Sequence, residues 1–140
     1  PKSIFKKTGQ VVFGGFGSTA QHSYFQLLHQ GTASVCADII TIEDNKNINK
    51  LLYAQSKAQS NLLANATKHD LKELEQVNSN IPTNLFTLKK LDPKSLGFLI
   101  ASWEHRTFIT AKMLQINPYD QYGVSAGKIF TKKYLKNYGG

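Results

Sequence analysis

The sequence predicts an α/β fold, in which three or so strands form a parallel sheet that helices cover on both faces. Apolar runs typical of strands alternate along the chain with stretches whose apolar residues recur at helical spacing. The 140 residues are 41% hydrophobic and 19% charged, which is ordinary for a globular chain of about one domain with a core. No internal repeat or low-complexity segment interrupts this alternation, which is therefore the main fold signal.

The N-terminal part predicts a short strand, a glycine-rich turn and a helix in succession. Val11–Phe13 is β-branched and aromatic, as expected for a strand. Gly14–Gly17 would form the turn, and Ser18 or Thr19 could cap the helix by accepting a hydrogen bond from an exposed backbone N–H. Gly31 would end this helix.

The middle of the chain predicts two further strands around a helical region. Ser34–Ile42 is a continuous apolar run rich in β-branched residues, which is typical of a buried strand. Asn47–Asn65 carries apolar residues at helical spacing, and Asp70–Val77 repeats that pattern briefly. The turn-rich segment 78–84 then leads to the third strand, Leu85–Leu88.

Two long helices are predicted for the C-terminal part. Asp92 and Pro93 indicate a helix start, because aspartate can cap and proline has no N–H to leave unpaired at the first helical position. This helix would run to about Ile116, and its first half is apolar nearly all round, so we expect burial on several sides. The final helix is predicted from about Gly123 to Asn137, with lysines near its end, where cations suit the helix dipole.

Two histidines lie on the first predicted helix. His22, Gln26 and His29 occupy positions i, i+4 and i+7, on a different stripe from the apolar residues that would face the core. At 1.5 Å per residue, His22 and His29 would stand roughly 10 Å apart along the axis, too far to bind one zinc ion together. The pattern therefore indicates a polar helix face, and we predict no metal site.

Two long blocks of the sequence resemble one known family. The first block has a Gln-His pair followed by Gln-Leu and then His-Gln-Gly-Thr, and its matching residues are Gln21, His22, Gln26, Leu27, His29, Gln30, Gly31 and Thr32. The second block comprises Trp103–Arg106 and Asn117–Lys128, with Asp-Gln-Tyr-Gly-Val and a closing Gly-Lys. In this order and spacing, the blocks resemble the C-terminal region of the phosphoglucose isomerase (glucose-6-phosphate isomerase) family. The wording of Asn80–Asn84 resembles that family as well.

The resemblance implies that residues 1–140 are the C-terminal part of a three-layer sugar-isomerase (SIS) domain, a fragment of a larger enzyme. The implied activity is the aldose–ketose interconversion of glucose 6-phosphate and fructose 6-phosphate, in glycolysis and gluconeogenesis, without metal or redox cofactor. By the same resemblance, His22 opens the sugar ring from across a homodimer interface, Lys128 assists ring opening, and Gln121 contacts sugar hydroxyls. The glutamate that moves the carbon-bound proton is expected upstream of this chain.

The formal charge of +8 does not indicate nucleic-acid binding. Arg106 is the only arginine among 17 basic residues, and the lysines are scattered from Lys2 to Lys136 rather than gathered on one element. Nucleic-acid readers favour arginine, whose planar fork binds bases and phosphates in a bidentate manner. We therefore expect no nucleic-acid partner, and the partner that the resemblance implies is a phosphorylated hexose.

The composition also indicates in which cellular compartment the protein is expected. No uncharged apolar stretch reaches about eighteen residues, and the N-terminal residues contain no apolar signal-peptide core, so we predict no membrane association. Cys36, the only cysteine, cannot pair within the chain and is predicted to be a small buried hydrophobe. These features fit a reducing compartment, and we expect a cytoplasmic protein.

Two other functions remain open at this point. Gly15–Ala20 satisfies the G-x-G-x-x-A pattern of dinucleotide-binding loops, and Glu43 follows the next predicted strand, as a ribose-binding acid would. In that case saturating NAD or NADP should raise the melting temperature. The second alternative is a basic, non-enzymatic interaction module, which would bind polyanions in a salt-sensitive manner.

Overall fold

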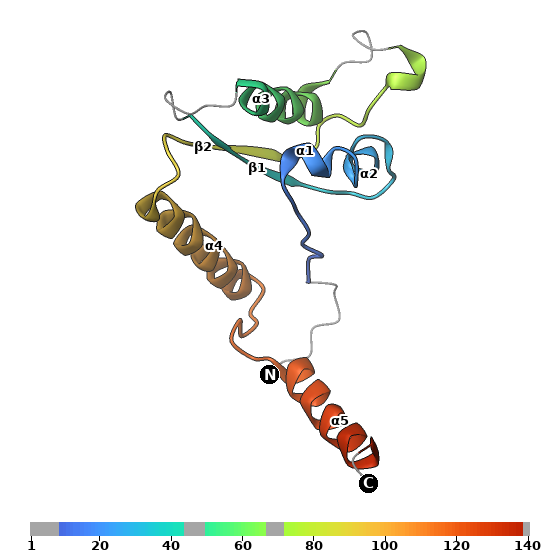
Figure 1. The fold of residues 1–140 in the computed structure, drawn as a ribbon, viewed down its shortest axis with the longest axis vertical. Coiled ribbons are helices and arrows are strands. Elements are labelled where there is room, and N and C mark those ends of the chain that lie inside the picture. The colour runs from blue at the N-terminus through green and yellow to red at the C-terminus, as the bar shows by residue number, and fades with distance from the viewer. Residues whose placement is uncertain (1–8, 44–49, 67–71, 139–140) are drawn as a thin grey trace. The chain divides into compact units, whose positions relative to one another are not determined.

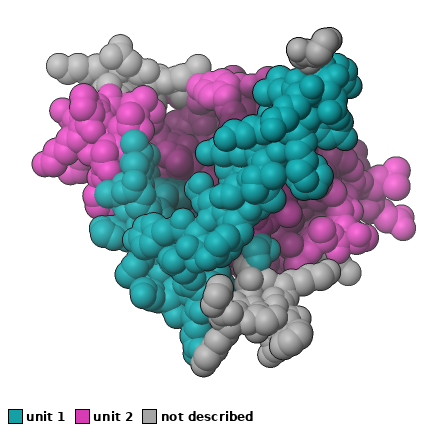
Figure 2. All heavy atoms as spheres, turned by 90° about the horizontal axis from the view of Figure 1, so that it is seen from below, with its two compact units in different colours: residues 1–9, 99–140 teal, residues 10–98 magenta. Residues whose placement is uncertain are grey.

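The structure, a computed structural model, describes residues 9–43, 50–66 and 72–138. The chain divides into two compact units, one formed by Gln10–Phe98 and the other by Pro1–Gly9 together with Leu99–Gly140 (Figure 2). The first unit contains the sheet and the segment around His22. The second contains most of helix α4 (Pro93–Met113) and all of helix α5 (Tyr122–Tyr138).

The unit of residues 10–98 is built on a two-stranded parallel sheet. Strands β1 (Ala37–Ile42) and β2 (Thr83–Leu88) pair in register from their first residues to their last. Helix α3 (Lys50–Asn65) lies between them in sequence and packs on both strands, as parallel pairing requires of a crossover connection (Figure 1). Among its described residues this unit also contains α1 (Gly17–Ala20), α2 (Phe25–Gln30) and the 3₁₀ turn η2 (Glu73–Glu75).

The core of this unit lies where α2, α3 and the beginnings of the two strands meet. Leu28, Leu63 and Ile81 form one buried cluster, and Leu63 is only 1% exposed. Five partly buried side chains pack around this cluster: Tyr24, Phe25, Val35, Ala37 and Ile39. Full burial of a large apolar side chain is worth roughly 1.5–3 kcal/mol, so this small cluster contributes to holding α2 against α3.

Helix α4 begins with the cap that the sequence predicts. The backbone N–H of Ser95 donates to Oδ1 of Asp92 at 2.8 Å, and Nζ of Lys90 lies 2.9 Å from Oδ2 of Asp92. The backbone bond from Ser95, and after it the contact with Lys90, lower the pKa of Asp92 to about 2. The helix ends at Met113, three residues before the predicted Ile116.

The predicted fold class is confirmed, because helices flank a small parallel sheet in an α/β arrangement. The predicted strand Leu85–Leu88 falls within β2, and the predicted final helix falls within α5, which is longer by one residue at each end. The part of the chain that the structure describes contains two strands rather than three.

The missing strand is the N-terminal one. Val11–Phe13 is not a strand: it pairs with neither β1 nor β2, and Val11 is 90% exposed. The predicted strand Ser34–Ile42 is shorter than expected, since pairing begins at Ala37, where Thr83 supplies a partner. A β-branched composition therefore marked residues that can form a strand, and the presence of a neighbouring strand decided which of them do.

The helical predictions in the middle of the chain are partly met. Helix α3 covers residues 50–65 of the predicted 47–65, and residues 47–49 lie outside the described residues. In the predicted Asp70–Val77 helix, residues 70 and 71 also lie outside the described residues, and the remaining residues form only the single turn η2. A stretch this short gains few helical hydrogen bonds to offset the cost of nucleation.

Two burial predictions are wrong. Cys36 is exposed rather than buried, because it precedes β1 and is not part of the paired strand. The apolar first half of α4 is not covered on several sides, since Phe98 is 67% and Ile100 54% exposed. Apolar spacing shows which side chains can be buried, but it does not supply the surface that buries them.

Candidate active site

His22 lies in a turn between two short helices. The predicted helix from residue 18 to residue 30 is interrupted: α1 ends at Ala20, residues 21–24 form turns, and α2 begins at Phe25. The side chain of His22 is exposed, and its backbone N–H donates to the carbonyl of Thr19 at 3.2 Å. His22 is therefore presented by a turn and not, as predicted, by the first turns of a continuous helix.

The start of this segment also differs from the prediction. Neither Ser18 nor Thr19 caps a helix, because Phe16 occupies the cap position of α1 and no side chain bonds to the exposed N–H groups there. The carbonyl of Phe16 instead accepts from the backbone N–H groups of Thr19 and Ala20, at 3.0 and 2.8 Å. The turn that leads to His22 is thus held by backbone bonds.

Aromatic packing accounts for the interruption of the helix. Tyr24 has φ −126° and ψ 0°, outside the helical region, and its ring packs edge-on against Phe13 with centroids 5.1 Å apart. The Tyr24 ring also contacts Phe25 at 5.7 Å between centroids. These contacts join residues on both sides of His22, and such aromatic pairs are worth about 0.5–1.5 kcal/mol beyond burial.

The end of α2 is as predicted, but for a different reason. Gly31 caps the helix with φ −74°, which is an ordinary backbone conformation. Glycine is required there by space: a Cβ atom at this position would stand 2.3 Å from the carbonyl oxygen of Leu27. Any larger residue would push the chain away from α2.

Three consecutive residues after Leu28 bind other parts of the chain. Nε2 of His29 lies 2.8 Å from Oε1 of Gln59 on α3, and the backbone N–H of Asn78 donates to the carbonyl of His29 at 2.5 Å.

The side-chain amide of Gln30 donates to the carbonyls of Leu74 and Gln76 at 3.1 and 2.9 Å. The Asn78 amide donates to the carbonyl of Gly31 at 2.7 Å. We call this set of bonds, which joins His29–Gly31 to Gln59 and to segment 74–78, the α2 anchor.

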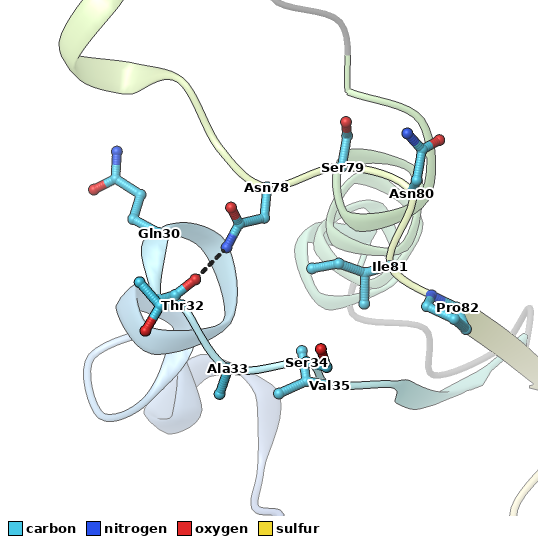
Figure 3. A pocket seen from close by; sticks show the side chains of 11 residues that line it. Gln30, Thr32, Ala33, Ser34, Val35, Asn78, Ser79, Asn80, Ile81 and Pro82 are labelled. Atoms are coloured by element: carbon cyan, nitrogen blue, oxygen red, sulfur yellow. Dashed lines mark hydrogen bonds between the residues drawn. The ribbon is translucent and has the colours of Figure 1, made fainter.

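An open groove of about 590 Å³ lies beside the α2 anchor (Figure 3). It runs between segment 30–35 and segment 78–82, the two stretches that lead into β1 and β2. Asn78 spans one end with the bond to Gly31 that Figure 3 draws as a dashed line. The groove is lined by uncharged residues only, so it offers no ionic partner for a phosphate.

Gln121 and Lys128 lie at the start of α5 and in its first half. Gln121 immediately precedes α5, and its carbonyl accepts the backbone N–H of Ser125 at 3.1 Å, so it continues the helical geometry. Gln121, Ser125 and Lys128 follow one another at i, i+4 and i+7, which places them on one stripe. The two outer residues are roughly 10 Å apart along the axis, with a small side chain between them. All three are exposed.

The predicted site residues thus fall in two places. His22 belongs to the unit of residues 10–98, whereas Gln121 and Lys128 belong to the other unit and share a helix face. Within the described ranges, no group of three or more His, Cys, Asp or Glu side chains is arranged to hold a metal ion. No helix among the described residues is long and apolar enough to cross a membrane.

The family model for phosphoglucose isomerase matches residues 2–139, almost the whole chain. The chain belongs to the phosphoglucose isomerase family. Its curated relatives include glucose-6-phosphate isomerase of Acinetobacter venetianus, 37% identical over 96% of this chain and 28% of the relative. Glucose-6-phosphate isomerase 2 of Neisseria meningitidis serogroup A is 38% identical over 92% of this chain and 27% of the relative.

The solved structures agree with this family assignment. The crystal structure of a glucose-6-phosphate isomerase from Chlamydia trachomatis matches with a TM-score of 0.84 and 29% identity, over 99% of this chain and 28% of that one. This member of the phosphoglucose isomerase family therefore spans little more than a quarter of the length of the relatives that it matches.

Neither alternative function is favoured by these findings. The G-x-G-x-x-A pattern of Gly15–Ala20 binds dinucleotides where a strand leads into the turn, and the preceding Val11–Phe13 forms no strand. A basic interaction module does not account for a family match along the whole chain. The sequence blocks that resemble phosphoglucose isomerase are therefore the better guide to function.

One contact of the site region was not anticipated from the sequence. His29 was singled out for its position, but Gln59, its partner on α3, was not among the candidates. Gln59 lies thirty residues along the chain in a helix with no motif, so only the packing of α2 on α3 brings the two together. The sequence around Gln59 therefore carries no signal that could have identified this contact.

Proposed function

We propose that this chain is the C-terminal part of a glucose-6-phosphate isomerase, an enzyme that interconverts glucose 6-phosphate and fructose 6-phosphate. The observation that carries the proposal is the phosphoglucose isomerase match over residues 2–139, in a chain whose curated relatives carry that enzyme's name. Residues 1–140 form part of its SIS domain, and the rest of the enzyme supplies the carboxylate that moves the carbon-bound proton. None of the nine acidic residues of this chain lies in a motif that resembles the family's glutamate.

Ring opening is the step that we assign to His22. The ring oxygen must gain a proton and the anomeric hydroxyl must lose one, so that the ring C–O bond breaks and a carbonyl forms. An imidazole can do both, and general acid–base catalysis of this kind contributes roughly a hundred- to ten-thousandfold. The exposed side chain of His22, on a turn fixed by packing on both sides, is suited to enter a site completed by other residues.

Lys128 and Gln121 act on the same substrate in this proposal. The ammonium group of Lys128 stabilises negative charge that develops on the substrate oxygens during ring opening and enediolate formation. Gln121 donates to or accepts from sugar hydroxyls. Their common stripe on α5, with Ser125 between them, leaves room for a hexose to lie along the helix.

The assembly and compartment belong to the same proposal. His22 enters the site of a second subunit, so the active enzyme is a homodimer, in the cytoplasm, acting in glycolysis and gluconeogenesis. The exposure of His22 supports a role in a neighbouring subunit, since the side chain has no hydrogen bond among the described residues that would keep it on its own surface.

The test uses the full-length enzyme with two substrates. Fructose 6-phosphate is mostly cyclic, whereas 5-deoxyfructose 6-phosphate lacks the hydroxyl that closes the ring. We expect His22→Ala to lower turnover of the cyclic substrate by about a hundredfold or more, and turnover of the open-chain analogue by far less. Turnover of both can be followed by NMR, with Ser23→Ala, the exposed neighbour in the same turn, as the control. Equal losses on the two substrates would remove the role assigned to His22.

A further inference from the structure

We propose that His29 is a positioning residue for His22, acting through its hydrogen bond with Gln59. This inference rests on the proposed function, because it concerns the ring-opening role of His22. The α2 anchor fixes the far end of α2, and α2 in turn fixes the turn that carries His22.

The turn around His22 is held against α3 from both sides. On the N-terminal side, Ala20 is 3% exposed, and α1 packs against α3. On the C-terminal side, Leu28 packs against Leu63 of α3, and His29 bonds to Gln59 of the same helix. Helix α3 is therefore the common support of both segments that flank His22.

The ring of His29 is held by one aromatic contact and one hydrogen bond. Its edge packs against Phe25 with centroids 5.9 Å apart, and Nε2 is directed to Gln59. Nδ1 is buried and has no hydrogen-bond partner among the described residues. The bond to Gln59 is thus the only polar contact of the ring among the described residues, and its loss would leave both ring nitrogens without a hydrogen-bond partner, which is unfavourable for a buried polar group.

The length of α2 makes this bond important for His22. Six residues are too few for a helix to be stable by itself, so α2 depends on its contacts with the rest of the unit. A shift of α2 would move the adjoining turn, and a displacement of about 1 Å at a catalytic group can cost on the order of a hundredfold in rate. His29 is therefore expected to affect ring opening although it lies seven residues from His22.

The experiment uses four variants of the full-length enzyme. His29→Phe keeps the ring and its contact with Phe25 but removes the hydrogen bond, and Gln59→Leu removes the partner instead. His29→Gln keeps an amide donor where Nε2 stands. Asn61→Ala, on an exposed position of α3 two residues after Gln59, is the matched control.

We expect His29→Phe and Gln59→Leu each to lower kcat on fructose 6-phosphate by at least about tenfold, with KM and turnover of 5-deoxyfructose 6-phosphate changed by less than about threefold. The double variant should lose little more than either single one, because both changes remove the same bond. His29→Gln should recover most of the activity, and Asn61→Ala should behave as wild type.

Three outcomes would overturn the inference: equal losses on both substrates, unchanged kcat in both bond-breaking variants, or additive losses in the double variant. If His29→Phe does not fold, Gln59→Leu decides alone. The proposed function is tested separately by His22→Ala. If His22→Ala loses more turnover on the cyclic substrate than on the open-chain analogue while Gln59→Leu does not, only the role of His29 is wrong.

Discussion

Asn84 of β2 donates its side-chain amide to Oδ1 of Asp38 on β1 at 2.8 Å, and the two residues are also direct register partners in the parallel sheet. The bond joins strands that are separated by forty-six residues in the sequence. A shift of one residue in pairing would separate the two side chains onto opposite faces of the sheet. This pair therefore favours the observed register.

Replacement of Asn84 should loosen the sheet locally. We expect Asn84→Ala to lower the opening free energy of the β2 amides by about 0.5–1 kcal/mol, because one exposed hydrogen bond to a carboxylate is lost. Hydrogen exchange of these amides in the full-length protein measures the change. Asn84→Asp places a second carboxylate opposite Asp38 and should destabilise at least as much at neutral pH, with recovery as the pair is protonated. Unchanged protection in both variants would contradict the assigned role.

Lys128 should differ from the other lysines of α5. In the full-length enzyme we expect both Lys128→Ala and Lys128→Arg to lose activity by at least about tenfold, because a guanidinium keeps the charge but not the compact geometry of the ammonium. Lys132→Ala, one turn along the same helix, should lose little. Activities should be compared among variants with matched melting temperatures. Wild-type turnover of Lys128→Ala would show that the role carried over to this position is wrong.

A polypeptide of residues 1–140 alone should not isomerise hexose phosphates. The family's carboxylate has no counterpart among its nine acidic residues, and loss of one member of a catalytic set costs on the order of a thousandfold or more. The purified polypeptide should match the blank in a coupled fructose 6-phosphate assay, with the full-length enzyme as positive control. Robust turnover would mean that one of the nine acids is the catalytic carboxylate.

The Asp92 carboxyl should titrate well below its usual range. Its pKa of about 2 in the folded chain, against 3.8 ordinarily, means that the carboxylate stabilises the folded state above about pH 4 and loses that contribution as the pH falls towards 2. An NMR titration of the side-chain carboxyl measures the value directly. Lys90→Ala should raise it only part of the way, because the backbone bond from Ser95 is the larger cause. A wild-type value near 3.8 would contradict the cap.

The sequence by itself determined the elements that depend on local chemistry. Asp92 and Pro93 mark the start of α4 because a cap and a proline act on the adjacent turn, whatever surrounds them. Gly31 ends α2 because a side chain there would collide with Leu27, one turn earlier. The family followed from the sequence too, since the blocks around His22 and Gln121–Lys128 are contiguous motifs.

Only the tertiary structure decided the features that need a distant partner. Val11–Phe13 has strand composition but no strand beside it among the described residues, and Ser34–Ile42 is paired only where Thr83 and the residues after it are available. Tyr24 interrupts an apparently continuous helix because its ring packs against Phe13 and Phe25. The bond between His29 and Gln59 depends on the packing of α2 against α3. Such contacts join segments that are far apart in the sequence, so no local sequence pattern indicates them.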